Sequence, residues 1–387
     1  MQDNEKKPAL RFKGFTDPWE QRKLGELVEI GDIDHRMPET VADGIPYLMT
    51  GDFVGTNELN FDGTKMISEE DYCQLSQKIK PEKGDILFAR YASVGAARYV
   101  DFTRKFLISY SCAIIKKSKK INSKYLYHFI TSGKVQQQIK LEINTGSQAN
   151  IGIDSMKNHI VVSMPPLEEQ TKIADALSNL DHLITLHQRK YEKLVNIKKS
   201  MLDKMFPKNG ASVPEIRFKG FTDLWEQRKL GEMVDVCSGM DYKHLSEGDI
   251  PVYGTGGYML SVNKALSYDR NAVGIGRKGT IDKPYILKAP FWTVDTLFYA
   301  IPKDSKNIDF TFDVFQKVDW KKKDESTGVP SLSKIAINET SISTPSKLEQ
   351  ERIGSFFRNL DTLITLHQRK LEKLQNIKKS CLEKMFV

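Results

Sequence analysis

Two loops of the sequence place basic and hydroxyl side chains beside glycines. They are ARYASVGAAR at 89–98 and IGRKGTIDK at 275–283. Glycine lets a backbone approach another molecule closely, and an arginine suits guanine O6/N7 or a phosphate. We therefore take both loops as candidate contacts to nucleic acid. The plain alternative is that Arg90 and Arg277 are ordinary surface residues.

The candidate contact residues are basic, hydroxyl, amide, aromatic or glycine residues of predicted loops. The first region supplies Arg90, Tyr91, Ser93, Arg98, Gly146, Ser147 and Gln148. The second region supplies Gly254, Thr255, Gly256, Gly257, Tyr258, Arg277, Lys278 and Thr280. Around them, β-branched and aromatic runs broken by glycine and proline are typical of strands and loops.

No catalytic constellation accompanies these loops. Residues 274–279 fit GxGxxG, but Pro284 and Pro290 leave no room for the helix that a dinucleotide-binding fold requires. The sequence contains no (N/D)PP(Y/F) tetrad of a methyltransferase and no GxxxxGK(S/T) loop for ATP. His182 and His187 are five residues apart, which is not the i,i+4 spacing of a shared metal. We expect no catalytic residue, no metal ligand and no cofactor bound by this chain.

Two segments of the chain occur twice. Residues 11–30 return at 217–236 with four of 20 positions changed, and residues 181–206 return at 361–386 with five of 26 changed. The two shifts, 206 and 180, differ, so the intervening middles have changed in length as well as sequence. The shared ends are therefore expected to do the same job twice, while the divergent middles do two different jobs.

The closing segment of each copy predicts a long helix with a heptad seam. The expected seam residues are apolar or histidine and recur at steps of three and four: Leu180, Ile184, His187, Tyr191 and Leu194 in the first copy, and Leu360, Ile364, His367, Leu371 and Leu374 in the second. About 40 residues at ~1.5 Å each give a rod of roughly 60 Å, which cannot bury its own stripe. We expect the two rods to pair. The alternative is that each helix packs on its own head.

We therefore expect an α+β chain with a pseudo-twofold, circular internal repeat. Two mixed α/β domains are separated by a pair of long antiparallel coiled-coil helices. The expected boundaries are 1–165 and 208–345 for the domains, and 166–207 and 346–387 for the helices.

Charge is concentrated on the predicted helices. Lys and Arg exceed Asp and Glu by 58 − 50 = 8, and residues 187–206 and 367–386 each carry a net +4. These stretches are either solvated helix faces or surfaces that face DNA or an acidic partner. No stretch approaches the ~20 apolar residues of a membrane span, and the four cysteines form no CxxC pair. We expect a cytoplasmic protein without membrane contact.

The duplicated plan resembles the specificity subunit of type I restriction–modification enzymes. The resemblance covers nearly the whole chain. It is carried by WEQRKLGE at 19–26 and 225–232, KGDILFAR at 83–90, IPVYGTGGY at 250–258, IGRKGTI at 275–281, and the helix entry MPPLEEQ at 164–170. The second helix entry, TPSKLEQ at 344–350, lacks one proline.

The resemblance implies that each domain is a target-recognition domain for one half of a bipartite double-stranded DNA site, with the helices setting the unread gap. It implies a non-catalytic chain that assembles with two methyltransferase subunits and with restriction and translocation subunits. S-adenosylmethionine, ATP and Mg would bind those partners. Trp19, Leu24, Trp225 and Leu230 are the expected docking residues.

The resemblance also implies that segment 11–26 packs against the end of the second helix and closes a ring. Two other interpretations stay open. One is a two-headed scaffold that binds proteins, and the other is the specificity chain of a modification-only system. An enzyme in its own right would need motifs that the sequence lacks.

Overall fold

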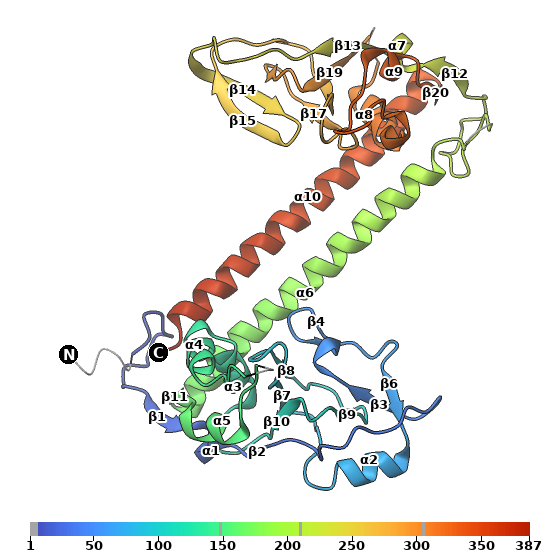
Figure 1. Cartoon of the computed structure of the whole chain (residues 1–387). Helices are drawn as coiled ribbons and strands as arrows, with labels where there is room; N and C mark the ends of the chain where they lie inside the picture. Colours follow the sequence, from blue (N-terminus) through green and yellow to red (C-terminus); the bar gives the residue numbers. More distant parts are fainter. Residues whose placement is uncertain (1–6, 147–148, 209–210, 304–305) are drawn as a thin grey trace. The chain divides into compact units, whose positions relative to one another are not determined.

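The computed structural model describes residues 7–146, 149–208, 211–303 and 306–387. It divides into two compact units, and each unit combines a globular head with parts of both long helices (Figure 1). Unit 1 comprises the chain up to Arg189 and from Arg369 onward, and unit 2 comprises Lys190–Gln368. Head 1 is the part of unit 1 that precedes residue 167, and head 2 is residues 211–346.

Head 1 contains two sheets and two strand pairs. The four-stranded antiparallel sheet has the order β2 (Ile30–Gly31), β10 (Cys112–Ile115), β7 (Ile86–Ala89), β8 (Ala97–Tyr99). The three-stranded sheet has the order β6 (Lys65–Ile67), β3 (Ile45–Leu48), β9 (Leu107–Ile108). The strand pairs are β1 (Glu20–Lys23) with β11 (Val161–Met164), and β4 (Phe53–Val54) with β5 (Glu58–Leu59). The helices are α1 (Leu24–Leu27), α2 (Glu69–Leu75), α3 (Ser123–Ile130), α4 (Gly133–Leu141) and α5 (Ile153–His159).

Head 2 repeats the two sheets and the β1–β11 strand pair of head 1 with different strand lengths, and its described residues contain no counterpart of the β4–β5 pair. Its four-stranded antiparallel sheet has the order β13 (Val234–Ser238), β19 (Leu297–Pro302), β16 (Ala272–Gly276), β17 (Tyr285–Leu287). Its three-stranded sheet has the order β15 (Gly257–Val262), β14 (Glu247–Gly254), β18 (Trp292–Thr293). Strand β12 (Glu226–Lys229) pairs with β20 (Ser341–Thr344). The helices are α7 (Leu230–Met233), α8 (Ile308–Lys317) and α9 (Lys334–Asn338).

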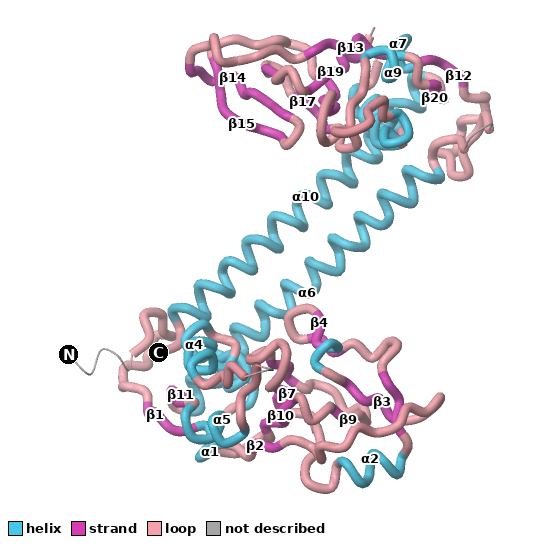
Figure 2. Tube along the Cα trace, in the orientation of Figure 1, coloured by secondary structure: helices cyan, strands magenta, loops and turns pink. Residues whose placement is uncertain are grey.

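The two long helices are α6 (Leu167–Lys204) and α10 (Lys347–Lys384), each an unbroken run of 38 residues (Figure 2). At ~1.5 Å per residue each is about 57 Å long. Their first turns are closed in the same way: Gln170 Nε2 donates to the Pro165 carbonyl at 2.8 Å and Gln350 Nε2 to that of Pro345 at 2.9 Å. The missing proline of the second copy, where Ser346 stands, does not disturb this contact.

The helices pair in antiparallel fashion within each unit. In unit 1, Asp181 near the start of α6 forms an ion pair with Lys378 near the end of α10, at 2.5 Å. In unit 2, Asp361 and Lys198 form the equivalent pair, also at 2.5 Å. The repeat shift of 180 converts one pair into the other. The expected α+β class with antiparallel helices is confirmed, and all ten expected seam residues are buried or half-buried.

Each head is closed by the end of the helix that belongs to the other copy. Leu10 N donates to the Lys384 carbonyl and Ile216 N to the Lys204 carbonyl, both at 2.9 Å. Trp19 of the first repeat segment shares a hydrophobic core with Phe386, so the expected contact between this segment and the end of the second helix is present. The end of α6 continues directly along the chain into head 2, through residues 205–215. The end of α10 contacts head 1 only through noncovalent interactions.

The helix ends complete the cores of the heads. In unit 1, the Phe386 ring lies 5.6 Å from that of Tyr125 and 5.5 Å from that of Phe129. In unit 2, the Phe206 ring lies 5.8 Å from Trp225 and 5.7 Å from Phe310. Phe386 and Phe206 are 1% and 5% exposed, so each head buries an aromatic side chain delivered by a helix end.

A buried titratable side chain lies where each head meets the helix pair. In unit 1, His128 of α3 is 1% exposed, and its Nε2 lies 3.1 Å from Ser178 Oγ of α6. Its Nδ1 lies 3.9 Å from the carboxylate of Asp181. In unit 2, Asp313 of α8 is also 1% exposed, and burial raises its pKa well above the usual range. The two units therefore differ in how this junction responds to protons.

Unit 1 is expected to lose stability as the pH falls from 6.5 to 5. Burial, with Lys378 and Lys124 nearby, lowers the pKa of His128 to about 3. The unfolded chain, with a histidine pKa near 6.5, takes up the proton first, so each pH unit below 6.5 costs about 1.4 kcal/mol. Urea unfolding followed by hydrogen exchange in residues 123–130 measures the slope of the unfolding free energy against pH. His128→Asn should flatten it, and a slope that persists in this variant contradicts the assignment.

Candidate functional site

The two candidate loops occupy equivalent places in their heads. Arg90 follows β7 and Arg277 follows β16. Arg90 N donates to the Ser111 carbonyl at 2.9 Å, and Arg277 N donates to that of Thr296 at 2.8 Å. Two matching backbone bonds therefore place both arginines at the end of a central strand.

A second chain segment joins each loop. Ile151 N donates to the Arg90 carbonyl at 3.1 Å, and Leu332 N donates to the Arg277 carbonyl at 3.0 Å. Isolated bridges add Tyr91 to Asn150 and Lys278 to Ser331. The structure thus brings the Arg90 loop together with the segment that holds the exposed Gly146. Ser147 and Gln148 lie outside the described residues.

Glycines shape both loops. Gly95 has φ +92°, and a Cβ there would lie 2.6 Å from Gln136 Oε1. A Cβ on Gly276 would lie 2.0 Å from the Thr280 carbonyl oxygen. Gly279 has φ +86°, a conformation that side chains disfavour. These glycines serve tight local folding in addition to any close approach to a ligand.

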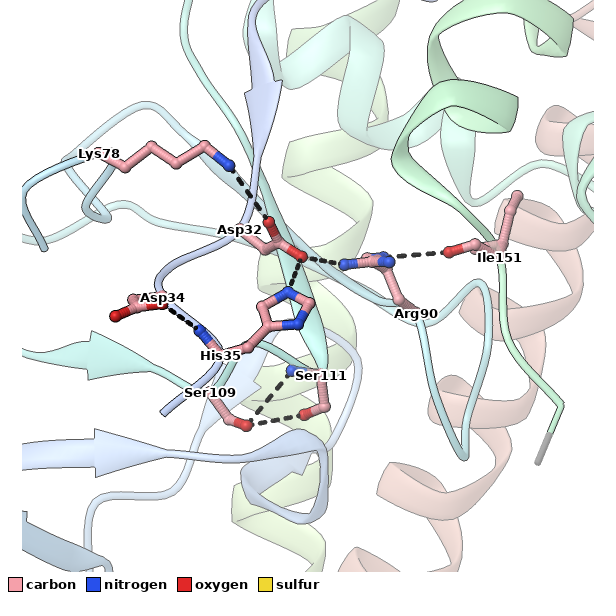
Figure 3. A network of polar contacts seen from close by, with 8 residues as sticks. All are labelled: Asp32, Asp34, His35, Lys78, Arg90, Ser109, Ser111 and Ile151. Carbon is pink, nitrogen blue, oxygen red and sulfur yellow. Dashed lines mark hydrogen bonds and ion pairs between the residues drawn. The ribbon is translucent and has the colours of Figure 1, made fainter. Parts of the chain in front are cut away.

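Arg90 is not a surface contact, which corrects the prediction made for it (Figure 3). Its guanidinium donates through Nη1 to Asp32 Oδ2 and through Nε to the Ile151 carbonyl at 3.0 Å. The side chains of Arg90 and Asp32 are 8% and 9% exposed. The arginine therefore joins three loops of head 1 internally and offers no free face to a ligand.

Arg98 is also committed to its own head. Its guanidinium donates to the carbonyls of Val54, Gly55 and Glu58 at 3.3, 3.0 and 3.2 Å. It also lies 5.1 Å from the centre of the Phe53 ring. Arg98 thus holds the β4–β5 hairpin against β8. Of the other loop candidates in head 1, Ser93 is exposed and Tyr91 is half-buried.

The candidates of head 2 are exposed or half-buried, except Gly254, which is buried. Arg277 and Lys278 are exposed and Thr280 is half-buried. Arg277 lies over the Phe298 ring at 5.7 Å, and its guanidinium has no hydrogen-bond partner among the residues that the structure describes. Five candidates lie in or beside the turn of the β14–β15 hairpin: Gly254, Thr255, Gly256, Gly257 and Tyr258. Tyr258, the second residue of β15, is 63% exposed.

The sequence analysis missed three residues near Arg90, namely Asp32, His35 and Lys78. His35 places Nε2 2.9 Å from Asp32 Oδ2, and its ring stacks on Tyr110 with centroids 4.9 Å apart. Lys78 lies 3.9 Å from the other Asp32 oxygen. The side chains of His35 and Lys78 are 59% and 74% exposed, so they form the outward side of this network. The available signal was the position of Asp32, two residues after the near-identical repeat segment ends.

The expected docking residues are core residues, which corrects that prediction. Trp19, Leu24, Trp225 and Leu230 are between 0% and 3% exposed. They pack with helix-end residues such as Phe386 and Phe206 in the cores of the two heads. The near-identity of segments 11–30 and 217–236 therefore serves the closure of the heads. Among the exposed apolar residues, two equivalent pairs lie on the long helices: Leu183 and Leu186 in unit 1, and Leu363 and Leu366 in unit 2.

No group of three or more His, Cys, Asp or Glu residues is placed to hold a metal ion within the described part of the chain. None of the described helices is both long and apolar enough to span a membrane.

Comparison with known proteins gives consistent results. The family model of the type I restriction modification DNA specificity domain matches residues 16–196 and 222–376. The putative MjaX specificity subunit of Methanocaldococcus jannaschii is 24% identical and covers 94% of this chain and 92% of its own length. The MjaVIII specificity subunit of the same organism is 22% identical, covering 94% and 91%. The fold is similar to that of the S subunit of a type I system from M. genitalium, with TM-score 0.74, 18% identity and coverage of 98% and 99%.

Replacing Arg90 should destabilise head 1 strongly. Arg90→Met leaves the buried Asp32 carboxylate without its main partner, which costs about 3–5 kcal/mol. The matched control is Arg277→Met, which breaks no ion pair and should change stability by less than about 0.5 kcal/mol. Hydrogen exchange resolved by head measures both. Equal stability of the two variants would contradict the assignment of Arg90 as a structural residue.

Proposed function

The chain belongs to the type I restriction modification DNA specificity family, and from this premise we propose that it is the sequence-reading subunit of a type I restriction–modification enzyme. Each head reads one half of a bipartite DNA site, and the helices set the gap between the halves. The subunit itself is non-catalytic. S-adenosylmethionine, ATP and Mg bind the partner subunits, and the enzyme acts in the cytoplasm.

One observation carries this proposal: the heads share a scaffold but differ in its exposed chemistry. The backbone bonds of Arg90 and Arg277 match one for one, whereas the surroundings of the two guanidinium groups do not. A scaffold that holds different side chains in the same place suits a protein that must read two different sequences. Arg277, Lys278 and Tyr258 supply head 2 with two cations and an exposed ring for DNA.

The helices suit the role of a spacer. Asp181–Lys378 and Asp361–Lys198 fix the same register of the helix pair in both units. Lys378 and Lys198 are each 12% exposed. Sliding of one helix along the other would leave these lysines without their carboxylate partners, so the ion pairs oppose it. A fixed register keeps the length between the recognition elements constant.

Methyltransferase partners dock on the exposed leucines of the helices in this proposal. Leu183 and Leu186 are 40% and 38% exposed, and their equivalents Leu363 and Leu366 are 43% and 45% exposed. An exposed apolar pair on a helix fits the apolar face of an amphipathic partner helix. The two leucine pairs, one in each unit, predict two methyltransferase subunits, and restriction subunits join the complex they form.

Exchanging head 1 should change only one half of the recognised sequence. The chain is expressed with its methyltransferase partner, residues 31–160 are replaced by those of another specificity subunit, and methylated bases are mapped by sequencing. We expect a bipartite methyladenine motif in which one half changes and the other half and the gap persist. If no modified base depends on the intact chain, a two-headed protein scaffold becomes the better interpretation.

Charged substitutions on the exposed leucines should remove partners one at a time. Leu186→Glu is expected to reduce the bound methyltransferase from two copies to one, and the double variant with Leu366→Glu to none, because a buried unpaired carboxylate opposes docking. Native mass spectrometry of the purified complex counts the copies. Leu141→Glu is the control, since Leu141 is 85% exposed on head 1. Retention of two copies in the double variant contradicts this docking surface.

A further inference from the structure

The equivalent arginines of the two heads differ in solvent exposure. Arg90 and Arg277 follow equivalent strands and make the same two backbone hydrogen bonds. Nevertheless the Arg90 side chain is buried, whereas Arg277 is exposed. A difference in backbone does not explain this, so its cause must lie in the side chains around each guanidinium.

The residue that differs is Asp32. Its carboxylate accepts from Arg90 Nη1 and from His35 Nε2, and Lys78 lies 3.9 Å away (Figure 3). The repeat shift of 206 places Ser238 at the equivalent position. Strand pairing agrees, since the preceding residues Gly31 and Cys237 align, through β10 and β19, with Leu87 and Gly274, each three residues before its loop arginine. A serine hydroxyl carries no charge, so it cannot form the ion pair that the Asp32 carboxylate makes with a guanidinium. In head 2, no carboxylate of the described residues pairs with Arg277.

We propose that the residue at position 32 or 238 decides whether the loop arginine of its head is available to DNA. This rests on the proposed function. In head 2, Ser238 leaves Arg277 free to read a base. In head 1, Asp32 holds the Arg90 side chain in the interior of the head through an ion pair, and the exposed His35 contacts DNA in its place. Asp32 and Ser238 are positioning residues, and Arg277 and His35 are the groups that touch DNA.

His35 is held in a form that can read a base edge. Stacking on Tyr110, with an interplanar angle of 25°, fixes the plane of the ring, and Asp34 Oδ1 accepts from His35 N at 2.8 Å. In the tautomer that donates Nε2–H to the Asp32 carboxylate, Nδ1 is a hydrogen-bond acceptor. Nδ1 has no hydrogen-bond partner within the described ranges. An acceptor at this point suits the amino group of adenine N6 or cytosine N4, whereas an arginine suits guanine.

The test in head 2 installs the missing carboxylate. Ser238→Asp is expected to capture Arg277 and so to reproduce the effect of Arg277→Ala. Both variants, assembled with the methyltransferase partner, should weaken binding to the cognate duplex about tenfold and relax one position in the second half of the methylation motif. Ser238→Asn is the control, because it has nearly the same size without the charge, and it should leave affinity and motif unchanged.

The test in head 1 removes the exposed ring. His35→Ala should relax one position in the first half of the motif and leave the second half intact. His35→Asn, which keeps an acceptor, should recover part of that selectivity. Hydrogen exchange of head 1 should be unchanged in both variants, since His35 is exposed.

The outcomes separate this inference from the proposed function. A wild-type complex that gives no bipartite motif refutes the proposed function. A normal wild-type motif overturns only the inference if Ser238→Asp leaves the second half intact while Arg277→Ala changes it. The same holds if His35→Ala leaves the first half unchanged.

Discussion

Neither long helix can bury its own apolar stripe, and this constraint organises the molecule. Each helix obtains its partner from the other copy of the repeat, as Asp181–Lys378 and Asp361–Lys198 show. The same exchange extends to the helix ends, where Phe386 enters the core of head 1 and Phe206 that of head 2. Because helix pairing and head closure use the same two helices, the heads and the spacer cannot be separated into independent parts.

Features that depend on periodicity or repetition could be predicted from the sequence. Steps of three and four residues identified the helices and their seam, and two shifted copies indicated equivalent halves. The fate of Arg90 could not be predicted, because it depends on a carboxylate 58 positions away, brought near by the pairing of β2 with β10 and β10 with β7. Trp19 and Trp225 were misassigned for another reason. A repeated apolar segment shows that it does the same job twice, but not whether that job is inside the core or at the surface.

The heads separate scaffold from reading chemistry. Backbone bonds at Arg90 and Arg277 are the same, whereas the side chains at 32 and 238 differ. Such a division lets recognition change through single positions without altering the strands that carry them. The cost falls on stability, since Asp32 requires a buried counter-charge in head 1 whereas Ser238 requires none.

The closure of head 1 by Phe386 has a consequence for synthesis on the ribosome. Residues 11–166 of head 1 emerge early, but Tyr125 and Phe129 wait for a ring that lies more than 200 positions downstream. Head 2 already has Phe206 when its own strands are made. The part of the protein translated first is therefore the part that matures last, and until then its unfinished core is the natural target of chaperones and proteases.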